Sequence, residues 1–503
     1  MNVFQNSLLQ LIVDTSTTLP ADVTAALASA FALENSCFQG QQALNIIADN
    51  IEISAQQRQP ICQDTGQLTF YISCPTDFNQ LNLENDIRHA VAQATQMGVL
   101  RPNSVNSLNG KNSGNNLGKG NPIIHFTQWE NDYVTIGIIL KGGGCENRSK
   151  QYSLPCELPQ LGLAGRDIKG VKACILQAIW EAQGLGCPSG FIGVAIGADR
   201  ASGYDHAKKQ LFRAIDDINP DPDLVALEKE IISEANNINI GVMGFGGQAT
   251  LLSCKIAAYD RIPASFFVSI AYNCWALRRY VVNLNAKSGE IIRTPDFKTK
   301  NSQRLSRPRS LTNSNVIKLK TPLNEDAIHQ LRVGDVVQLS GRILTARDAA
   351  HKYLINHDPI FDLNNQIIYH CGPVLVKDNN DWRVVAAGPT TSMREEPYQA
   401  KLIEKFKLRA IIGKGGLGQQ TQQALQAHGA VYLHAVGGAA QIYASCIRRV
   451  NCVYYLDEFG MPEAIWDFEC KDMPLIVTMD SHGQSWHQQI KDSTSQQLAK
   501  LFL

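Results

Sequence analysis

A change in composition after residue 293 divides this chain of 503 residues into two parts. The segment 294–315, TPDFKTKNSQRLSRPRSLTNSN, is rich in Ser, Thr, Asn, Lys and Arg and has almost no periodic apolar residue. This composition is typical of a linker, and a chain of this length exceeds what one hydrophobic core usually holds. We therefore predict a domain at 1–293, a linker at 294–315 and a second domain at 316–503.

Both parts alternate helical and strand patterns. In the first part, NLENDIRHAVAQATQMGVL has the apolar spacing of an amphipathic helix, and YVTIGIILKGGG and GFIGVAIGAD have the apolar runs of strands. In the second part, VGDVVQLSGRILTARDAAHKYL gives strands followed by the start of a helix. This alternation predicts an α/β fold on each side of the linker.

Charge and hydropathy argue against two classes of partner. Lys+Arg and Asp+Glu both number 46, so the net charge is about zero, which argues against binding to nucleic acid or to an anionic membrane. No apolar run approaches the roughly 18 residues that span a bilayer. The N-terminus, MNVFQNSLLQLIVDTSTTLP, lacks the basic region of a signal peptide. We therefore expect a cytoplasmic protein.

Glycine-rich turns are unusually dense in this chain. A backbone that approaches a ligand closely needs residues without a Cβ, and helix N-termini beside such turns offer free N–H groups to an anion. Repetition of this feature predicts a ligand with several negative groups. The turns are KGGGCENRSK, GLGCPSG, GVMGFGGQAT, GKGGLG and AVGGAAQ.

One of these turns, IIGKGGLG, matches the dinucleotide-binding pattern G-x-G-x-x-G. A dinucleotide site also needs an acidic residue about twenty positions further on, which binds the ribose hydroxyls. The strand that follows here is AVYLHAV, which ends in His434 and small residues. Because the acidic residue is missing, we expect Lys414 and the N–H groups of the turn to bind a small anion instead.

Polar residues cluster in three further turns, PICQDTGQ, LTARDAAH and GPTTSMREE. The planar fork of arginine matches the geometry of a carboxylate. Arginines that lie in turns, rather than on charged helix faces, favour a small anionic substrate over surface ion pairs.

Taken together, the motifs resemble those of the class I fumarate hydratases, the iron–sulfur hydro-lyases related to L(+)-tartrate dehydratase. The motifs are PICQDTG, LRPNSV, KGGGCENRS, GCPSG, GVMGFGGQATLL, GRILTARDAAHK, YHCGPV, GPTTSMR, IGKGGLG, LHAVGGAA and MDSHGQS. The resemblance implies α- and β-type units fused through 294–315. It implies an N-terminal α/β cluster-binding domain, a smaller C-terminal swivelling β/α domain, and a homodimer.

The resemblance also implies a [4Fe–4S] cluster on three cysteines that leave one iron open as a Lewis acid. The matching ligands are Cys62 in ICQDTG, Cys187 in GLGCPSG and Cys274 in AYNCWALRR. Cys145 stands where relatives often carry Ser, and we interpret it as a replacement beside the site. Cys371 in HCGP is an alternative ligand.

The resemblance assigns the remaining site residues by motif. Asp64 and Thr390 match the acid–base pair, and His351, His434 and His482 are alternatives for that task. The residues that match contacts to a small dicarboxylate substrate are Gln63, Arg101, Gly143, Gly144, Arg347, Arg394 and Lys414.

The implied reaction is reversible hydration of fumarate to (S)-malate. Two alternatives stay open. The substrate could be L(+)-tartrate or a related 2-hydroxy diacid, such as the hydrated form of a methylated fumarate, because the segment around Cys274 departs from the fumarase form. Alternatively, the chain could be a cluster-bearing dicarboxylate sensor without turnover.

Overall fold

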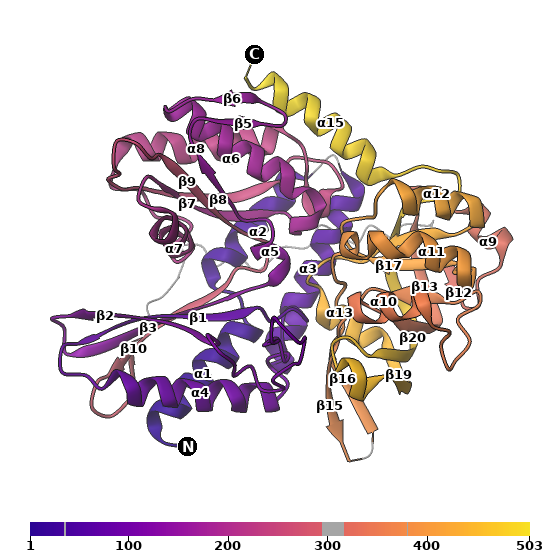
Figure 1. Ribbon diagram of the computed structural model, residues 1–503, viewed down its shortest axis with the longest axis horizontal. Coiled ribbons are helices and arrows are strands. Elements are labelled where there is room, and N and C mark those ends of the chain that lie inside the picture. The colour runs from indigo at the N-terminus through magenta and orange to yellow at the C-terminus, as the bar shows by residue number, and fades with distance from the viewer. Residues whose placement is uncertain (35–36, 294–315, 380, 503) are drawn as a thin grey trace.

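The computed structural model describes residues 1–34, 37–293, 316–379 and 381–502. The predicted linker 294–315 lies outside these residues. Helices and strands alternate before and after it, so the predicted two-part α/β fold is confirmed. Figure 1 shows the two parts side by side, with α3 (Phe38–Gln57) between them. The domain boundaries stay a prediction.

The first part contains a five-stranded sheet in the order β11-β10-β3-β1-β2. Helices α1 and α4 cover one face, where Leu8 and Ile87 pack with Phe70 and Ile136 in one core. The glycines of KGGGCENRSK follow the central strand β3 directly, so this turn lies at the end of that strand. The elements are α1 (Val3–Thr17), β1 (Gln67–Pro75), α4 (Gln80–Gln96), β2 (Ile123–Trp129), β3 (Tyr133–Lys141), α5 (Gly143–Glu146), β10 (Arg278–Asn285) and β11 (Ile291–Arg293).

A second sheet of the first part has the order β4-β9-β7-β8. Its strand β7 is buried along its whole length, as expected for an apolar run covered on both faces. Helices α6 and α8 pack on this sheet in a separate core. The elements are α2 (Ala21–Leu33), β4 (Lys150–Ser153), β5 (Cys156–Leu158), β6 (Gly162–Ala164), α6 (Ile168–Ala182), η1 (Gln183–Gly186), β7 (Gly190–Ile196), α7 (Arg200–Gln210), α8 (Pro222–Asn237), η2 (Val242–Gly244), β8 (Leu251–Ala258) and β9 (Phe267–Asn273).

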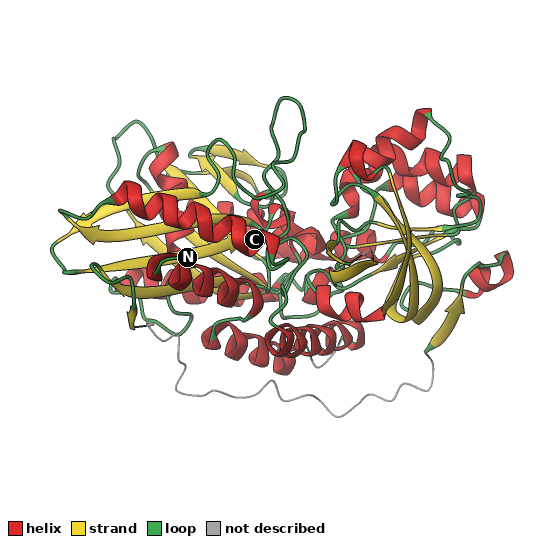
Figure 2. Cartoon of the chain, turned by 90° about the horizontal axis from the view of Figure 1, so that it is seen from below, coloured by secondary structure: helices red, strands yellow, loops and turns green. Residues whose placement is uncertain are grey.

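The second part is built on a seven-stranded sheet in the order β12-β13-β14-β17-β18-β20-β19. Because β13 also pairs with β20, five of its strands close into a ring. Figure 2 shows helices gathered on one side of these strands. The elements are β12 (Ile317–Lys320), α9 (Glu325–Gln330), β13 (Val336–Thr345), α10 (Asp348–Asn356), β14 (Ile367–Tyr369), β15 (Val374–Asp378), β16 (Asp381–Ala386), η3 (Ser392–Glu395), α11 (Glu396–Phe406), β17 (Ala410–Gly413), α12 (Gln419–His428), β18 (Val431–His434), α13 (Ala440–Cys446), β19 (Ile447–Tyr454), α14 (Leu456–Phe459), β20 (Ile465–Met479) and α15 (Trp486–Lys500).

The two parts share one hydrophobic core. Ile61 and Trp275 of the first part belong to the same cluster of buried residues as Val436 of the second. At the C-terminal end, α15 reaches back over the first part (Figure 1), where Trp180 Nε1 donates to Thr494 Oγ1 at 3.1 Å. The contact between the parts therefore combines a shared apolar core with hydrogen bonds, and the swivelling motion stays a prediction.

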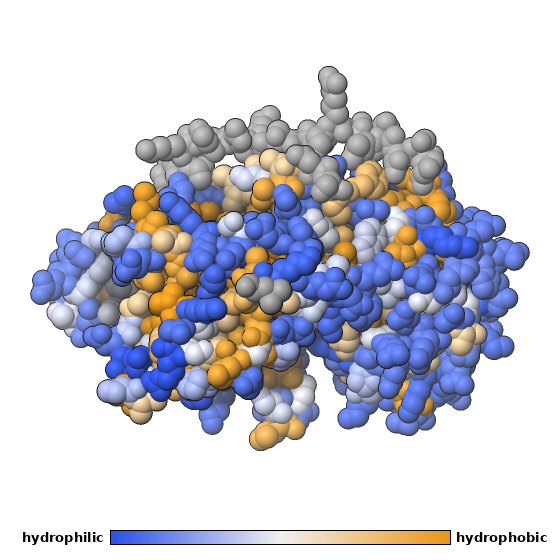
Figure 3. Space-filling view, turned by 90° about the horizontal axis from the view of Figure 1, so that it is seen from above, coloured by the Kyte–Doolittle hydropathy of each residue, from blue (hydrophilic) through white to orange (hydrophobic). Residues whose placement is uncertain are grey.

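On the face that Figure 3 shows, hydrophilic residues cover most of the second part, and hydrophobic residues are scattered more densely over the first. Scattered apolar residues are normal at the surface of globular proteins. Among the described residues, no helix combines the length and apolar character of a membrane span.

Glu34 gives the fold a dependence on pH. The side chain is fully buried, and its Oε1 accepts the N–H of Ala249 at 2.7 Å. Burial raises the pKa of Glu34 to about 7 despite this hydrogen bond. A carboxyl whose pKa is higher in the folded state binds more protons there, so the free energy of unfolding falls as pH rises from about 4.5 to 7.

We expect Glu34→Gln to remove this loss of stability. Relative to the wild type, the variant should gain about 3 kcal/mol in free energy of unfolding at pH 8 and little at pH 4.5. Urea titrations at both pH values measure the difference. Glu130→Gln, at an exposed position, is the control; an equal pH-dependent gain in both variants would contradict the account.

Candidate active site

Three of the buried thiols come from segments far apart in the sequence. Cys62 follows α3, Cys187 follows η1, and Cys274 follows β9. Cys62 and Cys187 are 7% and 3% exposed, and Cys274 is half-buried. Cys187 and Cys274 both lie within electrostatic reach of Cys62. The fold therefore brings the three predicted cluster ligands into one neighbourhood; their role as ligands stays a prediction.

A buried lysine lies against these thiols. Lys414 Nζ donates a hydrogen bond to Cys187 Sγ at 3.0 Å. Burial raises the pKa of the Cys187 thiol, and Lys414 opposes that rise. Burial would lower the pKa of Lys414, but interactions with Cys187 and Cys62 outweigh it and raise that pKa. The ammonium group is therefore placed to balance thiolate charge.

Cys145 is a fourth thiol at the same place. It lies in α5, is 7% exposed and shares a hydrogen bond with Cys274. That bond, reinforced by Lys141 and Lys414 against burial, lowers the pKa of Cys145 to about 6. The position beside the site agrees with our interpretation of Cys145. Cys371 is also buried, and burial raises its pKa to about 12.

A residue without a side chain packs directly against one of the predicted cluster thiols. Among the described residues, no group of three or more His, Cys, Asp or Glu side chains could hold one metal ion. A four-iron cluster instead takes its thiolates on separate irons, so its ligands stand further apart. A Cβ on Gly437 would overlap Cys187 Sγ and lie 2.9 Å from Lys414 Cδ, so the absence of a side chain there keeps room beside this thiol.

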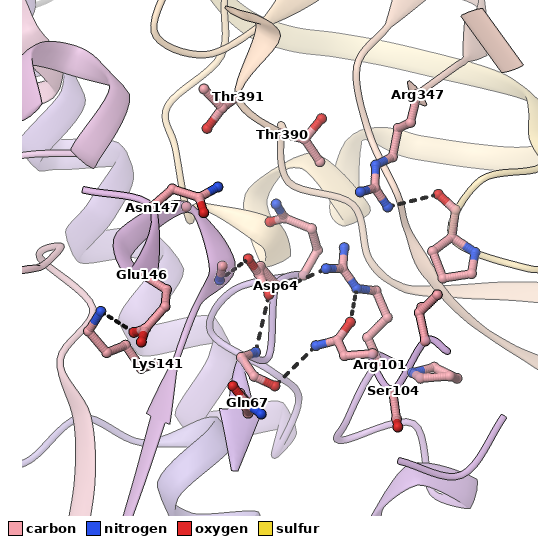
Figure 4. Close-up of a pocket in the computed structure, with 18 of the residues that line it drawn as sticks. Asp64, Gln67, Arg101, Ser104, Lys141, Glu146, Asn147, Arg347, Thr390 and Thr391 are labelled. Carbon is pink, nitrogen blue, oxygen red and sulfur yellow. Dashed lines mark hydrogen bonds and ion pairs between the residues drawn. The ribbon is translucent and has the colours of Figure 1, made fainter. Parts of the chain in front are cut away.

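A cavity of about 700 Å³ lies at the boundary between the two parts. In Figure 4, Asp64 and Arg101 of the first part lie opposite Thr390, Thr391 and Arg347 of the second. All nine residues predicted to act in catalysis or substrate binding line this cavity; their individual roles stay predictions. They are Gln63, Asp64, Arg101, Gly143, Gly144, Arg347, Thr390, Arg394 and Lys414.

Asp64 is held in one orientation by donors on both sides. Its Oδ2 accepts the N–H of Gly143 at 2.9 Å, and its Oδ1 accepts Arg101 NH2 at 3.3 Å. Burial raises the pKa of Asp64, but Arg101, Arg278 and Lys414 outweigh it and lower that pKa. The carboxylate thus lies at the cavity wall with a fixed geometry.

Arg101 and Gln63 connect the two parts. Arg101 NH1 donates to Gly372 O at 3.0 Å, and Gln63 Nε2 donates to Pro389 O at 2.9 Å. Both side chains are buried. The catalytic wall of the first part is therefore hydrogen-bonded to backbone of the second.

On the opposite wall, backbone bonds hold the turn that carries Thr390. The Thr390 N–H donates to His370 O at 2.7 Å, and the Lys414 N–H donates to Thr390 O at 3.3 Å. His370 Nδ1 is hydrogen-bonded to Ser392 Oγ at 2.8 Å behind this turn. The Thr390 hydroxyl itself is buried and has no hydrogen-bond partner among the described residues, which leaves it available to a ligand.

Arg347 and Arg394 already have carboxylate neighbours. Arg347 NH1 pairs with Glu463 at 3.0 Å, and Arg394 NH2 pairs with Asp348 at 3.4 Å. Glu395 is fully buried beside them, and its two carboxyl oxygens have no hydrogen-bond partner among the described residues. Burial and the charge of Asp348 raise the pKa of Glu395 to about 8, against the opposing effect of both arginines.

The turn IIGKGGLG departs in part from its predicted use. Lys414 lines the cavity, but the N-terminus of α12 is occupied by the protein's own Glu396. The carboxylate of Glu396 accepts the N–H of Gly418 at 2.7 Å and that of Thr421 at 3.2 Å. An internal carboxylate therefore fills the anion site of this helix, so the N–H groups of Gly418 and Thr421 are not available to a ligand. The use of the other N–H groups of the turn stays a prediction.

The three alternative histidines do not line the cavity. His351 is buried between Arg347 O and Gln399, His482 is hydrogen-bonded to His329 O, and the ring of His434 packs against Phe245.

Sequence analysis missed Arg278. This residue is 2% exposed, and its NH2 donates to Asp64 O at 2.8 Å. Its Nε and NH1 have no hydrogen-bond partner among the described residues. Two consecutive arginines inside the apolar strand pattern WALRRYVVNL were the available signal, because an unpaired buried charge is costly.

Comparisons with known proteins identify the family of the chain. The model of the family "Fumarate hydratase (Fumerase)" matches residues 5–283, and that of the "Fumarase C-terminus" family matches residues 283–490. The chain belongs to the class I fumarate hydratase family. It is therefore a hydro-lyase. A Geobacillus stearothermophilus protein named "Putative fumarate hydratase class I" is 53% identical over 508 residues, which cover 99% of each chain.

Two further relatives each match about a third of the chain. The "L(+)-tartrate dehydratase subunit beta" of Escherichia coli K12 is 38% identical over 170 residues, 33% of this chain and 84% of that protein. The Methanocaldococcus jannaschii protein named "Putative L(+)-tartrate dehydratase subunit beta" is 43% identical over 185 residues, 36% of this chain and 95% of its own length.

We expect anion binding in this hydro-lyase to weaken above pH 8, because Glu395 then ionises beside Arg347 and Arg394. The dissociation constant for succinate, a saturated dicarboxylate, should rise on the order of tenfold between pH 7 and 9. Glu395→Gln should make it nearly independent of pH in that range. Isothermal titration calorimetry measures both. Glu404→Gln, at an exposed position on the following helix, should behave like the wild type. A steep rise of the dissociation constant with pH that persists in Glu395→Gln would contradict the view that Glu395 causes it.

Proposed function

We propose that this hydro-lyase is a fumarate hydratase that interconverts fumarate and (S)-malate and uses a [4Fe–4S] cluster as Lewis acid. The observation that carries the proposal is the meeting of two sets of residues at one boundary. Three cysteines from distant segments lie near one another, and the cavity lined by Asp64 and Thr390 lies beside them, with Lys414 in contact with both.

Cys62, Cys187 and Cys274 would hold the cluster. Three thiolates leave one iron free, and when bound that iron supplies a Lewis acid for a substrate oxygen. Buried thiolates need compensating charge, and Lys414 provides it at 3.0 Å from Cys187. Arg278 is a second buried cation that lowers the pKa of Cys62 against the larger effect of burial.

The remaining residues suit a dianion of four carbons. Arg101 and Lys414 lie on the side of the cysteines, and Arg347 and Arg394 lie on the side of α10 and η3. Arginine can bind a carboxylate through two parallel hydrogen bonds. Cations on both sides of one cavity can therefore fix both carboxylates and align the carbons between them.

Asp64 and Thr390 face this space from opposite parts of the chain and form the proposed acid–base pair. Hydration adds a proton to one alkene carbon and hydroxide to the other, and dehydration reverses both transfers. One group must therefore exchange a proton with carbon while the other serves the water oxygen. Asp64 is fixed by Gly143 and Arg101. The Thr390 hydroxyl is without a partner among the described residues and needs the cationic surroundings of Arg394 to exchange a proton.

L(+)-tartrate is the second candidate substrate. The support for it is the similarity of about a third of the chain to two proteins named for the tartrate dehydratase β subunit. The match to the fumarate hydratase relative covers both parts, which favours fumarate. A cluster-bearing dicarboxylate sensor is the non-enzymatic alternative, and the family assignment as a hydro-lyase argues against it.

The proposal extends to the organisation of the protein. It includes domains at 1–293 and 316–503 joined by the linker 294–315, a homodimer, and a cytoplasmic location. It also includes a swivelling second domain, whose movement would open the cavity at the boundary.

Loss of any ligand cysteine should abolish the cluster. After anaerobic reconstitution, we expect about four irons and a broad visible absorption near 400 nm in the wild type. Cys62→Ser, Cys187→Ser and Cys274→Ser should each lose most of that iron. Cys74→Ser is the control, because Cys74 is buried in the core of the five-stranded sheet. A variant of the three that keeps a full cluster would remove that cysteine from the ligand set.

Changes in the acid–base pair should lower turnover without removing the cluster. Asp64→Asn and Thr390→Val should each reduce kcat by a factor on the order of 100 or more. The assay follows fumarate absorbance under anaerobic conditions, with L(+)-tartrate as parallel substrate. Turnover of tartrate without malate from fumarate would overturn the fumarate assignment, and tight dicarboxylate binding without turnover of either would favour the sensor.

A further inference from the structure

The glycine turn AVGGAAQ, residues 435–441, supplies none of the proposed catalytic residues, substrate contacts or cluster ligands. It connects β18 to α13 in the second part of the chain. It does not line the substrate cavity among the residues found there, yet it is buried from end to end. Its contacts lead to each of the three segments that carry a predicted cluster ligand.

The first contact is with Trp275, the residue that follows Cys274. Trp275 is fully buried, and its Nε1 donates to Gly437 O at 2.8 Å. A Cβ on Gly438 would lie 2.9 Å from the same indole ring. The indole is therefore fixed by one hydrogen bond and by close packing against this turn.

The second contact reaches Cys187. Gly437 packs so closely on this thiol that a Cβ there would overlap Cys187 Sγ. Lys414 also borders this position. Its Nζ is 3.0 Å from the same sulfur, and its Cδ lies 2.9 Å from the place that a Cβ on Gly437 would take. The turn therefore forms a wall against the second ligand.

The third contact reaches the segment of Cys62. Ile61 O accepts the N–H of Ala440 at 3.4 Å and Asn50 Nδ2 at 2.9 Å. Asn50 Oδ1 in turn accepts the N–H of Gln441 at 2.7 Å, and Gln441 Nε2 donates to Pro60 O at 2.7 Å. These bonds tie both residues before Cys62 to the turn, directly or through Asn50.

We infer that the 435–441 turn of the second part sets the spacing of the three cluster ligands, with Trp275 and Gly437 as its main positioning residues. This inference rests on the proposed cluster. Three ligands on separate segments do not fix one another, and groups that orient metal ligands from outside change metal affinity by tenfold or more. The turn supplies a common reference for all three, so the second part of the chain contributes to cluster retention without supplying a ligand.

Release of iron from the anaerobically reconstituted protein tests this inference. We expect Trp275→Phe, which keeps a buried ring but loses the N–H donor, to release iron to a chelator on the order of tenfold faster than the wild type. Trp180→Phe is the matched control. Trp180 also donates its indole N–H across the boundary, to Thr494, but it does not adjoin a predicted ligand cysteine in the sequence. Iron release from Trp180→Phe should therefore be nearly as slow as from the wild type.

A second variant tests the turn from its other side. Gly437→Ala keeps the Trp275 donor and its acceptor but crowds Cys187. We expect it to take up less iron and, after one-electron reduction of the cluster, to show an altered electron paramagnetic resonance spectrum. Circular dichroism and urea titration establish that each variant is folded. If Trp275→Phe does not fold, Gly437→Ala alone decides.

The outcomes separate this inference from the proposed function. Wild-type protein that takes up no cluster would overturn both. A wild-type cluster that is retained equally well by Trp275→Phe and Gly437→Ala would overturn only the role of the turn. Equal acceleration in Trp180→Phe and Trp275→Phe would also overturn it, because the effect would then come from contact between the parts in general.

Discussion

The hydrogen bond from Lys414 to Cys187 is the interaction on which the rest of this architecture depends. It joins a lysine of the second part to a thiol of the first, and it lies between the predicted cluster and the cavity. Burial alone favours the neutral form of both groups. Lys414 opposes the rise that burial causes in the pKa of the Cys187 thiol, and the pKa of Lys414 is itself raised. In our proposal, a buried cation at this point serves three needs at once: it balances thiolate charge, it attracts a dianion, and it fixes the two parts of the chain to each other.

This arrangement explains why the site lies at a boundary rather than inside one sheet. The predicted cluster ligands and Asp64 come from the first part, while Thr390, Arg347 and Arg394 come from the second. Hydrogen bonds from Arg101 and Gln63 to backbone carbonyls of the second part keep the facing walls in register. In our account the 435–441 turn extends the same principle to the ligands, so substrate site and cluster site depend on one docked arrangement.

The sequence predicted residues that lie within local motifs better than it predicted contacts that form only on folding. The α/β character could be predicted from the alternation of helical and strand patterns. The nine predicted site residues that line the cavity and the three neighbouring cysteines could be predicted from the resemblance of their motifs to a known family. The occupation of the α12 N-terminus could not be predicted, because Glu396 is distant from that helix in sequence and fills it only after folding. Arg278 was missed although the paired arginines of WALRRYVVNL were a local signal, because its contact with Asp64 joins segments 214 residues apart. The contacts of the 435–441 turn join segments 160 to almost 400 residues apart, and no periodicity or spacing could indicate them.

The most direct test of the central claim is an anomalous difference map at the iron absorption edge, from crystals grown without oxygen. Our account places one cluster-sized peak between the sulfurs of Cys62, Cys187 and Cys274, with the 435–441 turn against it and the cavity on its open side. A peak bound by a different set of residues, such as one that includes Cys371, would contradict the account. So would crystals of the reconstituted, active enzyme that show no iron at this boundary.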